Sequence, residues 1–238
     1  MYLIWIALIF SVTTPAFGQN NDSNATEFPY LASLGPCSAT IISDRWLVTA
    51  AHCLRKSNNV TMQRSSSETK VLNYSKIVKH PQFKWLAGIA PINDIALIRL
   101  AEPLTLNDDV KPVELPKGRM SSNVPAVFVH KTDHNTLMKR NVTQMFGERC
   151  LGYFDPSQRG FIRPQLRLFE TVSICTKEVA VPPGPCAENT AGPMVQNDTL
   201  YGISSYIHQY GNYGPNCYRL YFFTNIANYV RWIQSVIV

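Results

Sequence analysis

The sequence predicts an all-β fold that ends in a short helix, and two patterns carry this prediction. Short apolar runs of strand length, such as ATIIS, RWLVTA, IALIRL, PAVFVH and LYFFTNI, recur between turn residues at intervals typical of barrels or sandwiches. Helical periodicity is nearly absent until about residues 226–237, where apolar residues recur three and four apart. These residues are Ile226, Tyr229, Val230, Ile233 and Ile237. A final strand is the alternative, but the length and the spacing favour a helix.

Residues 1–18 are expected to be a signal peptide, which leaves residues 19–238 as the mature protein. Residues 3–12 form an apolar stretch that is too short to span a bilayer and fits a signal-peptide core. Small residues place the cleavage after Gly18, with a cut after Ala16 as the second choice. A buried N-terminal strand or an uncleaved anchor is the alternative. The sequence therefore predicts a secreted, extracellular protein with no membrane span after the signal peptide is removed.

Secretion allows the six cysteines to be interpreted as disulfides, although their number alone selects no pairing. The chain has no CxxC pair and no His-rich cluster, so we expect no structural metal and no cofactor. Six N-x-S/T sequons in a secreted chain favour a glycoprotein. The candidate acceptors are Asn21, Asn24, Asn59, Asn73, Asn141 and Asn197.

The formal charge of +6 comes from scattered lysines and arginines. Such a charge favours solubility first, and secondly a weak binding to acidic glycans or anionic surfaces. No nucleic-acid-binding module is recognisable, so we expect no nucleic-acid partner.

Three segments carry the residue types that nucleophilic catalysis needs. WLVTAAHC contains His52, NDIALIRL contains Asp94 and CAENTAGP contains Thr190. Such catalysis requires a hydroxyl that attacks, an imidazole that takes its proton and a carboxylate that orients the imidazole. A lone histidine or aspartate would be uninformative, but here each lies in its own apolar strand context. The three residues therefore form a candidate catalytic triad.

The motifs around these residues resemble the chymotrypsin/trypsin-like serine proteases (peptidase S1) over nearly the whole mature chain. CSATIISDRWLVTAAHC resembles that family's histidine segment, and IVKHPQF with NDIALIRL resembles the approach to its aspartate. FPYLASL, SIC, GISSYI and NYVRWIQ complete the series in the family's order. So many motifs at family spacings are specific for the fold.

The resemblance implies two six-stranded antiparallel β-barrels of the chymotrypsin type, with the triad in the cleft between them. The N-terminal barrel would cover about 28–115 and the C-terminal barrel about 125–224, with the proline-bearing segment 111–125 as the best candidate linker. The resemblance also implies the disulfides Cys37–Cys53, Cys150–Cys175 and Cys186–Cys217. The first would close the loop that holds His52, and the last would join the nucleophile loop to the wall of the substrate pocket.

The nucleophile loop departs from the family pattern. The family has Gly-Asp-Ser-Gly-Gly-Pro where this chain has Glu-Asn-Thr-Ala-Gly-Pro, residues 188–193. Thr190 keeps a hydroxyl, but its extra methyl restricts χ1 and crowds the attacking oxygen. The oxyanion hole would use the N–H groups of Glu188 and Thr190, and Glu188 replaces a glycine, so its side chain crowds the reacting carbonyl. Misplacing one such donor is worth roughly 2.7–4 kcal/mol in analogous enzymes.

The activation switch of the family is lost at both of its ends. Asn189 replaces the aspartate that pairs, in the family, with the new N-terminal ammonium, and a neutral amide cannot balance that charge. The chain has no Arg/Lys-Ile-Val-Gly-Gly sequence, and the family's new N-terminus falls near Phe17, at the signal-peptide cleavage site. The sequons at Asn21 and Asn24 follow directly, and a glycosylated N-terminus is poorly suited to insertion into a buried pocket.

The specificity pocket is expected to be altered and filled. Gly184 stands where trypsin-like enzymes carry an aspartate, so cleavage after Arg or Lys is not expected. The run Ser205, Tyr206 and Ile207 replaces the family's Ser-Trp-Gly, and Ile207 would narrow the mouth of the pocket. Tyr221 aligns with a pocket-lining glycine, and its phenol should fill the cavity.

These departures lead to two hypotheses. The first is a secreted, glycosylated, non-catalytic serine-protease homologue that binds a protein partner, such as a protease, an inhibitor or a cell-surface protein. The alternative is a threonine-dependent endopeptidase of low activity that uses Thr190, with His52 as base and Asp94 as its orienting group. A side chain of Tyr221 or Ile207 turned into the pocket favours the first hypothesis, and one turned out of it favours the second.

The remaining histidines are given no catalytic role. His80 precedes a proline in a loop typical of the family. His130, His134 and His208 are expected to be solvated loop residues.

Overall fold

The computed structural model describes the chain from residue 27 to the C-terminus with several gaps. The described ranges are 27–54, 59–63, 69–86, 90–122, 124–131, 137–146, 148–154, 156–178, 184–185, 191–213 and 216–238. The expected signal peptide, the first two sequons (Asn21 and Asn24), His134 and the nucleophile loop 186–190 lie outside these ranges.

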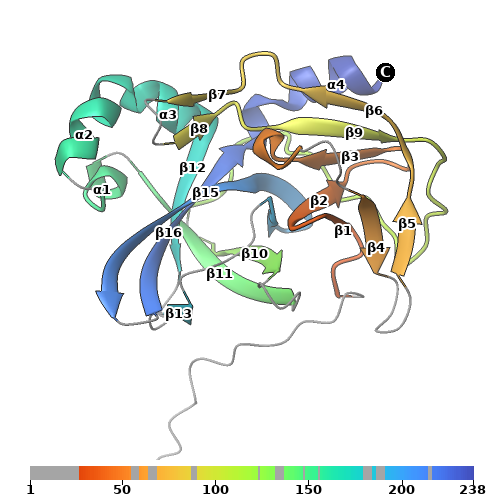
Figure 1. The fold of residues 1–238 in the computed structure, drawn as a ribbon, viewed down its shortest axis with the longest axis horizontal. Coiled ribbons are helices and arrows are strands. Elements are labelled where there is room, and N and C mark those ends of the chain that lie inside the picture. The colour runs from red at the N-terminus through yellow and green to blue at the C-terminus, as the bar shows by residue number, and fades with distance from the viewer. Residues whose placement is uncertain are drawn as a thin grey trace, which may run out of the picture.

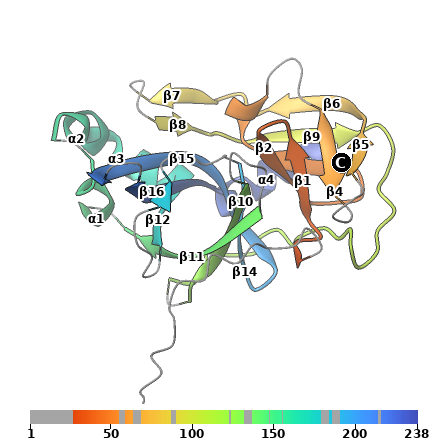
Figure 2. The same ribbon diagram turned by 60° about the horizontal axis from the view of Figure 1, so that its bottom comes forward.

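Strands from the first half of the chain form one antiparallel sheet of seven strands that curls into a half-barrel (Figure 1). Its order is β5-β4-β1-β2-β3-β9-β6. The strands are β1 (Leu31–Leu34), β2 (Cys37–Ile41), β3 (Trp46–Thr49), β4 (Val60–Gln63), β5 (Thr69–Leu72), β6 (Tyr74–Lys79) and β9 (Ala96–Leu100). A separate hairpin of β7 (Lys84–Leu86) and β8 (Ala90–Ile92) lies against the second half of the molecule, where β8 contacts β15 (Figure 2).

Strands from the second half close into a six-stranded antiparallel barrel. The ring runs β10-β11-β12-β16-β15-β14 and returns to β10, because β12 pairs with β16 as well as with β11. Its members are β10 (Ala126–Lys131), β11 (Leu137–Met145), β12 (Ser173–Glu178), β14 (Pro193–Gln196), β15 (Thr199–Tyr213) and β16 (Asn216–Asn225). The short β13 (Gly184–Pro185) pairs with β16. The predicted all-β, chymotrypsin-like fold class is therefore confirmed.

Apolar side chains explain why these runs form strands. Every residue of β2 and β3 is buried, as expected for strands covered on both faces, and the side chains of Ile41, Leu47 and Val48 are completely enclosed. In the second barrel, Phe128, Tyr221 and Phe223 pack as neighbouring rings inside a cluster of buried apolar residues. Burying side chains of this size supplies most of the free energy that favours folding.

Three short helices, which the sequence did not predict, interrupt the second barrel between β11 and β12. They are α1 (Glu148–Leu151), α2 (Pro156–Ile162) and α3 (Leu166–Val172), with a 3₁₀ turn η3 (Arg163–Gln165) between the last two. They pack at the left of the molecule in Figure 1. Each has at most seven residues, which is too short to develop a repeating apolar face. A disulfide between Cys150 and Cys175 ties this insertion to β12.

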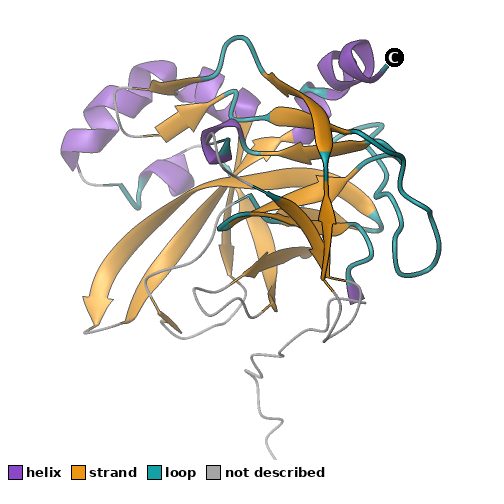
Figure 3. Ribbon diagram, turned by 45° about the vertical axis from the view of Figure 1, so that its right-hand side comes forward, coloured by secondary structure: helices purple, strands orange, loops and turns teal. Residues whose placement is uncertain are grey.

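The predicted C-terminal helix is present. It consists of a 3₁₀ turn η4 (Ile226–Asn228) followed by α4 (Val230–Ile237), at the top right of Figure 3. Ile226, Tyr229 and Ile233 are its buried residues, as the apolar spacing predicted. His80 packs edge-on against the rings of Tyr229 and Trp232, at centroid distances of 5.3 and 4.9 Å, and so helps to seat the helix. Among the described residues, no helix has the length and apolar character needed to cross a membrane.

Substitution of Ile233 tests how strongly the C-terminal helix anchors the fold. Ile233 is fully enclosed, so Ile233→Ala should lower the free energy of unfolding by about 2–5 kcal/mol, measured by urea denaturation. Ile237→Ala is the matched control, because the same helix leaves Ile237 half-exposed, and its loss should be clearly smaller. Equal losses for both variants would contradict the assignment of Ile233 as the anchor.

Candidate functional site

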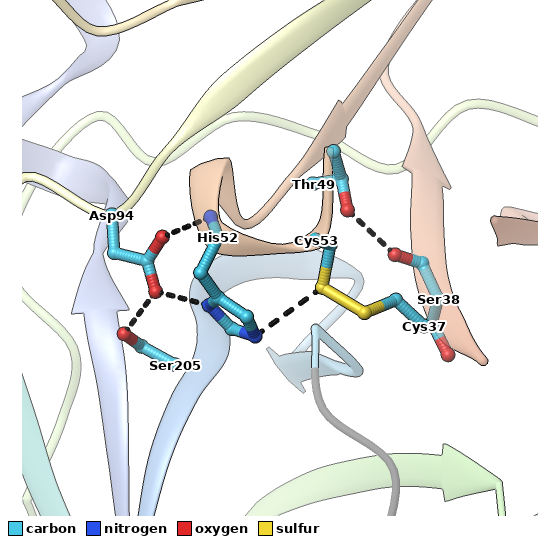
Figure 4. Close-up of a disulfide and its surroundings, with 7 residues drawn as sticks. All are labelled: Cys37, Ser38, Thr49, His52, Cys53, Asp94 and Ser205. Atoms are coloured by element: carbon cyan, nitrogen blue, oxygen red, sulfur yellow. Dashed lines mark hydrogen bonds and ion pairs between the residues drawn. A yellow bond between two sulfur atoms is a disulfide. The ribbon is translucent and has the colours of Figure 1, made fainter. Parts of the chain in front are cut away.

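His52 and Asp94 meet because two paired strands bring them to the same end of the first sheet. Thr49, the last residue of β3, is paired with Ala96, the first residue of β9. His52 follows β3 on a single 3₁₀ turn, η2 (Ala51–Cys53), and Asp94 directly precedes β9. The imidazole Nδ1 lies 2.6 Å from Asp94 Oδ2, and the backbone N–H of His52 donates to Asp94 Oδ1 at 2.9 Å (Figure 4). The Asp94 carboxylate thus fixes the imidazole by binding both the ring and the backbone N–H of His52.

Asp94 is also bound by the second barrel. Its side chain is 1% exposed, and its Oδ2 accepts a hydrogen bond of 2.5 Å from the hydroxyl of Ser205 (Figure 4). Ser205 is the extra residue of a β-bulge, because Ser204 pairs with Phe223 and Tyr206 pairs with Phe222. Such a bulge re-aims a side chain locally. The backbone carbonyl of Asp94 accepts a second bond of 2.8 Å from the Thr224 hydroxyl. The sequence placed Ser205 only at the specificity pocket, and Thr224 carried no prediction.

Asn93 sets the direction in which the chain enters the Asp94 site. It has a positive φ of 52°, a left-handed conformation that asparagine tolerates better than most residues. Its side chain donates to the carbonyl of Gln82 and accepts from the hydroxyl of Tyr229 at 2.8 Å. Burial, reinforced by the charge of Asp94, raises the pKa of Tyr229, so this phenol stays protonated as a donor. The C-terminal segment therefore supports the loop that carries Asp94.

The other imidazole nitrogen of His52 faces the Cys37–Cys53 disulfide. His52 Nε2 lies 3.3 Å from the Sγ of Cys53, as Figure 4 shows. Cys37, His52 and Cys53 are close enough together to suggest a metal site, but both sulfurs are bonded to each other. A disulfide offers no thiolate, and thiolates are the sulfur ligands that zinc requires. The Cys37–Cys53 disulfide therefore packs against the 3₁₀ turn that carries His52.

The position of the nucleophile lies outside the described residues, but both flanks of its loop are described. Thr190, Asn189 and Glu188 fall in the 186–190 gap, together with Cys186 of the third expected disulfide. On the far side, the backbone N–H of Ala191 donates to the carbonyl of Ser204 at 2.7 Å. The loop is therefore attached to β15 one residue before the bulge that aims Ser205.

Ala191 and Gly192 meet opposite backbone requirements at this attachment. Ala191 is fully buried with a φ of 64°, in the left-handed region where a Cβ is unfavourable. The motif of the resembling family has a glycine there. Gly192 could not be replaced, because a Cβ at this residue would lie 2.0 Å from the carbonyl oxygen of Val129. The chain has thus introduced strain at one residue of the loop and kept the necessary glycine at the next.

The residues predicted to fill the specificity pocket lie together on β15 and β16. Ile207 and Tyr221 are directly paired across the two strands. Tyr221 is fully buried, and its ring meets that of Phe128 at 5.1 Å in an edge-on arrangement. Ile207 is half-buried and packs against the same apolar cluster. Gly184 is paired through its backbone with Cys217 on the neighbouring edge of β16. The Tyr221 ring is therefore turned into the barrel and away from solvent.

His208 is a half-buried strand residue, which corrects the expectation that it is solvated in a loop. It lies on β15, and its ring stacks on Phe154 at a centroid distance of 4.4 Å. Its Nε2–H donates to the carbonyl of Tyr153 at 2.9 Å, which leaves Nδ1 to accept from the Tyr206 hydroxyl at 3.4 Å. Burial lowers the pKa of His208, and the bond to Tyr153 opposes this shift only in part. Burial raises the pKa of Tyr206, so both groups are neutral near pH 7.

His130 is completely buried on β10, so the expectation of a solvated loop is wrong for this residue as well. Its ring stacks on Phe128 at 5.0 Å, and its Nε2 accepts from the Nε–H of Arg140 at 2.9 Å. The misleading feature was the polar run that follows it, KTDHNT, which made the end of the strand hard to place. The chain keeps this imidazole as a buried acceptor, one residue after Val129, whose carbonyl oxygen leaves no room for a Cβ at Gly192.

The assembled groups can supply the base half of a hydrolytic site. An imidazole whose Nδ1 is held by a buried carboxylate can take a proton at Nε2 from a nearby hydroxyl. The hydroxyl of Thr190 and the oxyanion donors expected from Glu188 and Thr190 lie outside the described ranges. The base and its orienting group are therefore present, and Tyr221, which was predicted to fill the specificity pocket, is buried against Phe128.

Comparison with known proteins places this geometry in context. A family model described as Trypsin matches residues 18–233. Human Serine protease 58 is 30% identical over 261 residues, which covers 99% of this chain and 97% of that protein. The protein named Probable inactive serine protease 58 from Bos taurus is 28% identical over 262 residues, covering 100% and 98%. Serine protease 1 from Rattus norvegicus is 29% identical over 223 residues, covering 88% and 85%.

Solved structures share the fold at lower sequence identity. Neuropsin, a serine protease expressed in the limbic system of mouse brain, superimposes with a TM-score of 0.73 at 22% identity, covering 91% of this chain and 98% of that chain. Kallikrein-related peptidase 10, solved in complex with Zn²⁺, gives a TM-score of 0.67 at 21% identity, covering 90% and 97%. At these identities the likeness concerns the fold.

Relief of the strain at Ala191 should stabilise the protein. Ala191→Gly removes a left-handed penalty of about 1–2 kcal/mol and loses part of that gain to the greater freedom of glycine when unfolded. We expect the free energy of unfolding to rise by about 0.5–1 kcal/mol in chemical denaturation. Ala39→Gly in β2 is the control at a residue without positive φ, and it should destabilise. A loss of stability for Ala191→Gly would show that the methyl contributes more than the strain.

Acid should weaken the fold through His208. Because burial lowers its pKa from 6.5, the folded state binds this proton less readily than the unfolded state. The contribution of His208 is therefore complete above about pH 6.5 and is lost as the pH falls below that value. His80 acts in the same direction, since burial also lowers its pKa. Melting temperatures measured from about pH 7.5 to 5 should fall less for His208→Gln than for wild type. An identical pH dependence of the melting temperature in the variant would show that His208 does not contribute to the acid sensitivity.

Proposed function

The chain belongs to the trypsin family of serine proteases, and on this premise we propose that it is a secreted, glycosylated, non-catalytic member that acts by binding a protein partner. The observation that carries the proposal is the Tyr221 ring. It is 0% exposed and lies opposite Ile207, at the position where the family pattern has a pocket-lining glycine. A substrate side chain needs an open cavity at this place, and the phenol occupies it.

The nucleophile loop supports the same conclusion from its sequence. Thr190 carries a crowding methyl, Glu188 replaces the glycine of the oxyanion hole, and Asn189 cannot balance the charge of an inserted N-terminus. Each change alone could be tolerated by a weak enzyme. Their combination with a filled pocket weakens attack, charge stabilisation and substrate binding together, and residual catalysis in this family depends on the last two.

The retained His52 and Asp94 fit a structural role in this proposal. Asp94 lies in the first half of the chain, and its partners Ser205 and Thr224 lie on β15 and β16 of the second barrel. The hydrogen bonds of Asp94 therefore hold the two halves together whether or not a nucleophile is present. Breaking a buried charged group away from its partners typically costs several kcal/mol, which is sufficient reason to keep the pair.

Secretion and glycosylation are supported by the disulfides and by the exposure of the acceptors. Disulfides join Cys37 to Cys53 and Cys150 to Cys175, and such bonds persist in oxidising compartments. The four sequon asparagines within the described ranges are all exposed: Asn59, Asn73, Asn141 and Asn197. We place the protein outside the cell, with residues 1–18 removed as a signal peptide.

The proposed partner is a protein such as a protease, an inhibitor or a cell-surface protein. Loops around the cleft carry most of the exposed variable surface of such a scaffold, and binding residues are commonly placed on loops. Bos taurus has a relative whose name, Probable inactive serine protease 58, describes a loss of activity, and we extend that loss to this chain. Weak binding of acidic glycans is a second part of the proposal, based on the formal charge of +6.

A threonine-dependent endopeptidase is the second candidate function, and the intact His52–Asp94 pair favours it. The imidazole is held at 2.6 Å by a buried carboxylate, as a general base requires. In this reading Thr190 is the nucleophile, and a small or apolar side chain precedes the scissile bond.

Labelling with a fluorophosphonate separates the two functions. The secreted protein is treated with the probe, freed of N-glycans enzymatically and weighed intact, beside Thr190→Ser, Thr190→Ala and an active trypsin. We expect no adduct on wild type, because the Thr190 methyl crowds the attacking oxygen and Glu188 replaces the glycine of the oxyanion hole, and we expect a complete adduct on the trypsin. We also expect a loss of mass on deglycosylation and a mature N-terminus near residue 19.

An adduct on wild type that maps to Thr190 and disappears in Thr190→Ala would establish the enzyme reading. An adduct on Thr190→Ser alone would place the whole defect in the threonine methyl and would contradict a dismantled oxyanion hole. An unchanged mass after deglycosylation would remove glycosylation from the proposal and leave the loss of catalysis standing.

A further inference from the structure

Two adjoining cavities flank an exposed phenylalanine on the second barrel, away from His52 and Asp94. One of about 750 Å³ lies between the end of β11, the helices α1 and α3, β12 and η4. The other, of about 800 Å³, lies between β11, α1 and β12. They share Gln144, Met145 and Phe146, and Phe146 is 58% exposed. We call the two cavities and the ring between them the Phe146 face. Both volumes are typical of sites that bind small ligands.

Exposed cations line both cavities. Arg119 and Arg167 line the first cavity, and Arg149 and Lys177 line the second. All four residues are exposed, and within the described part of the chain their side chains form no hydrogen bond or ion pair. Exposed guanidinium groups that are not engaged in other hydrogen bonds are suited to bidentate binding of carboxylate or sulfate oxygens.

Acidic residues compensate this charge only in part. Glu148 in the second cavity is paired with Arg163 at 2.8 Å, so its charge is already balanced. Among the described residues that line the first cavity, Glu170 is the only acidic one, and two arginines, Arg119 and Arg167, line the same cavity. The lining of the face therefore keeps a net positive charge on both sides of Phe146.

The neutral polar groups of the first cavity resemble those that bind sugar hydroxyls. Ser122, Gln144 and Ser173 line it with side chains that make no hydrogen bond within the described part of the chain. Amide and hydroxyl groups can donate and accept at once, as a sugar hydroxyl requires of its partners. The exposed ring of Phe146 adds an apolar platform, on which the C–H face of a pyranose ring can lose contact with water.

We propose that the Phe146 face binds an acidic oligosaccharide, with carboxylate or sulfate groups on the two pairs of cations and a sugar ring packed on Phe146. An acidic peptide suits this face less well. A peptide commonly binds by adding a strand to a free sheet edge, and here β11 and β12 are each paired on both sides within the closed barrel. The proposal gives the acidic-glycan affinity a defined location, and it holds whether or not Thr190 is catalytic.

The test is the affinity of the secreted full-length protein for a heparin octasaccharide, a sulfated uronic-acid probe, by isothermal titration at an ionic strength of about 0.1 M. Arg149→Gln/Lys177→Gln and Arg119→Gln/Arg167→Gln should each weaken binding at least tenfold, about 1.4 kcal/mol. Glu170→Gln should strengthen it, because a repelling charge is removed from the first cavity. Melting temperatures should be unchanged, since all of these side chains are exposed.

Lys76→Gln/Arg99→Gln is the matched control. It removes one lysine and one arginine from exposed, directly paired positions of β6 and β9 in the other half of the molecule. We expect this variant to lose less than about threefold in affinity for the octasaccharide, because these charges would act only through the overall electrostatic field of the protein. An equal loss in this control, or no measurable binding of the octasaccharide by wild type, would overturn the proposal.

Phe146→Ser separates an oligosaccharide from an acidic polypeptide. The variant should weaken heparin binding, and it should leave the weaker binding of a polyglutamate peptide of equal charge unchanged. Polyglutamate that binds as tightly as heparin, with the same response to the cation variants, would show that the face binds acidic polypeptides. The proposal of an oligosaccharide ligand would then be wrong. None of these outcomes depends on the fluorophosphonate result, so this proposal and the loss of catalysis can fail separately.

Discussion

The buried carboxylate of Asp94 is the constraint on which the rest of the structure depends. A carboxylate that is 1% exposed is tolerated only when hydrogen bonds replace the water it has lost. Asp94 receives them from the backbone and ring of His52 in the first half of the chain and from Ser205 in the second barrel. Its backbone carbonyl receives another from Thr224. Because these donors come from two separate sheets, the carboxylate determines how the two halves are joined.

Because of this arrangement, the presence of an intact histidine and aspartate is weak evidence for catalytic activity. In an enzyme of this family the carboxylate serves the imidazole, and the imidazole serves the nucleophile. In this chain the imidazole also serves the carboxylate, since loss of the ring would leave a buried charge with fewer donors. The pair therefore has a structural reason to persist whether or not the chain is catalytic. The state of the pocket and of the nucleophile loop is the better indicator of function.

The fold class and the terminal helix could be predicted because they depend on local patterns. Strand-length apolar runs and the 226–237 spacing are visible in the sequence itself. The hydroxyl of Ser205 could not be assigned to Asp94, because the bond depends on a bulge and joins residues 111 positions apart. His130 and His208 were mistaken for solvated residues because their partners, Arg140 and Tyr153, are brought to them only by the folded barrel. The helices between β11 and β12 are too short for their periodicity to be recognised.

Filling the specificity pocket with Tyr221, as we propose, would also favour the fold. A cavity lined by apolar groups lowers stability, and burying an aromatic ring in it returns contacts that an open site must do without. Tyr221 makes such contacts with Phe128 and Phe223, and Ile207 packs across from it. Removing the phenol alone would leave a void in this cluster and would not reverse the sequence changes at Glu188 and Asn189. The binding role that we propose is therefore better assigned to outer faces such as that around Phe146, where binding requires no opening of the barrel.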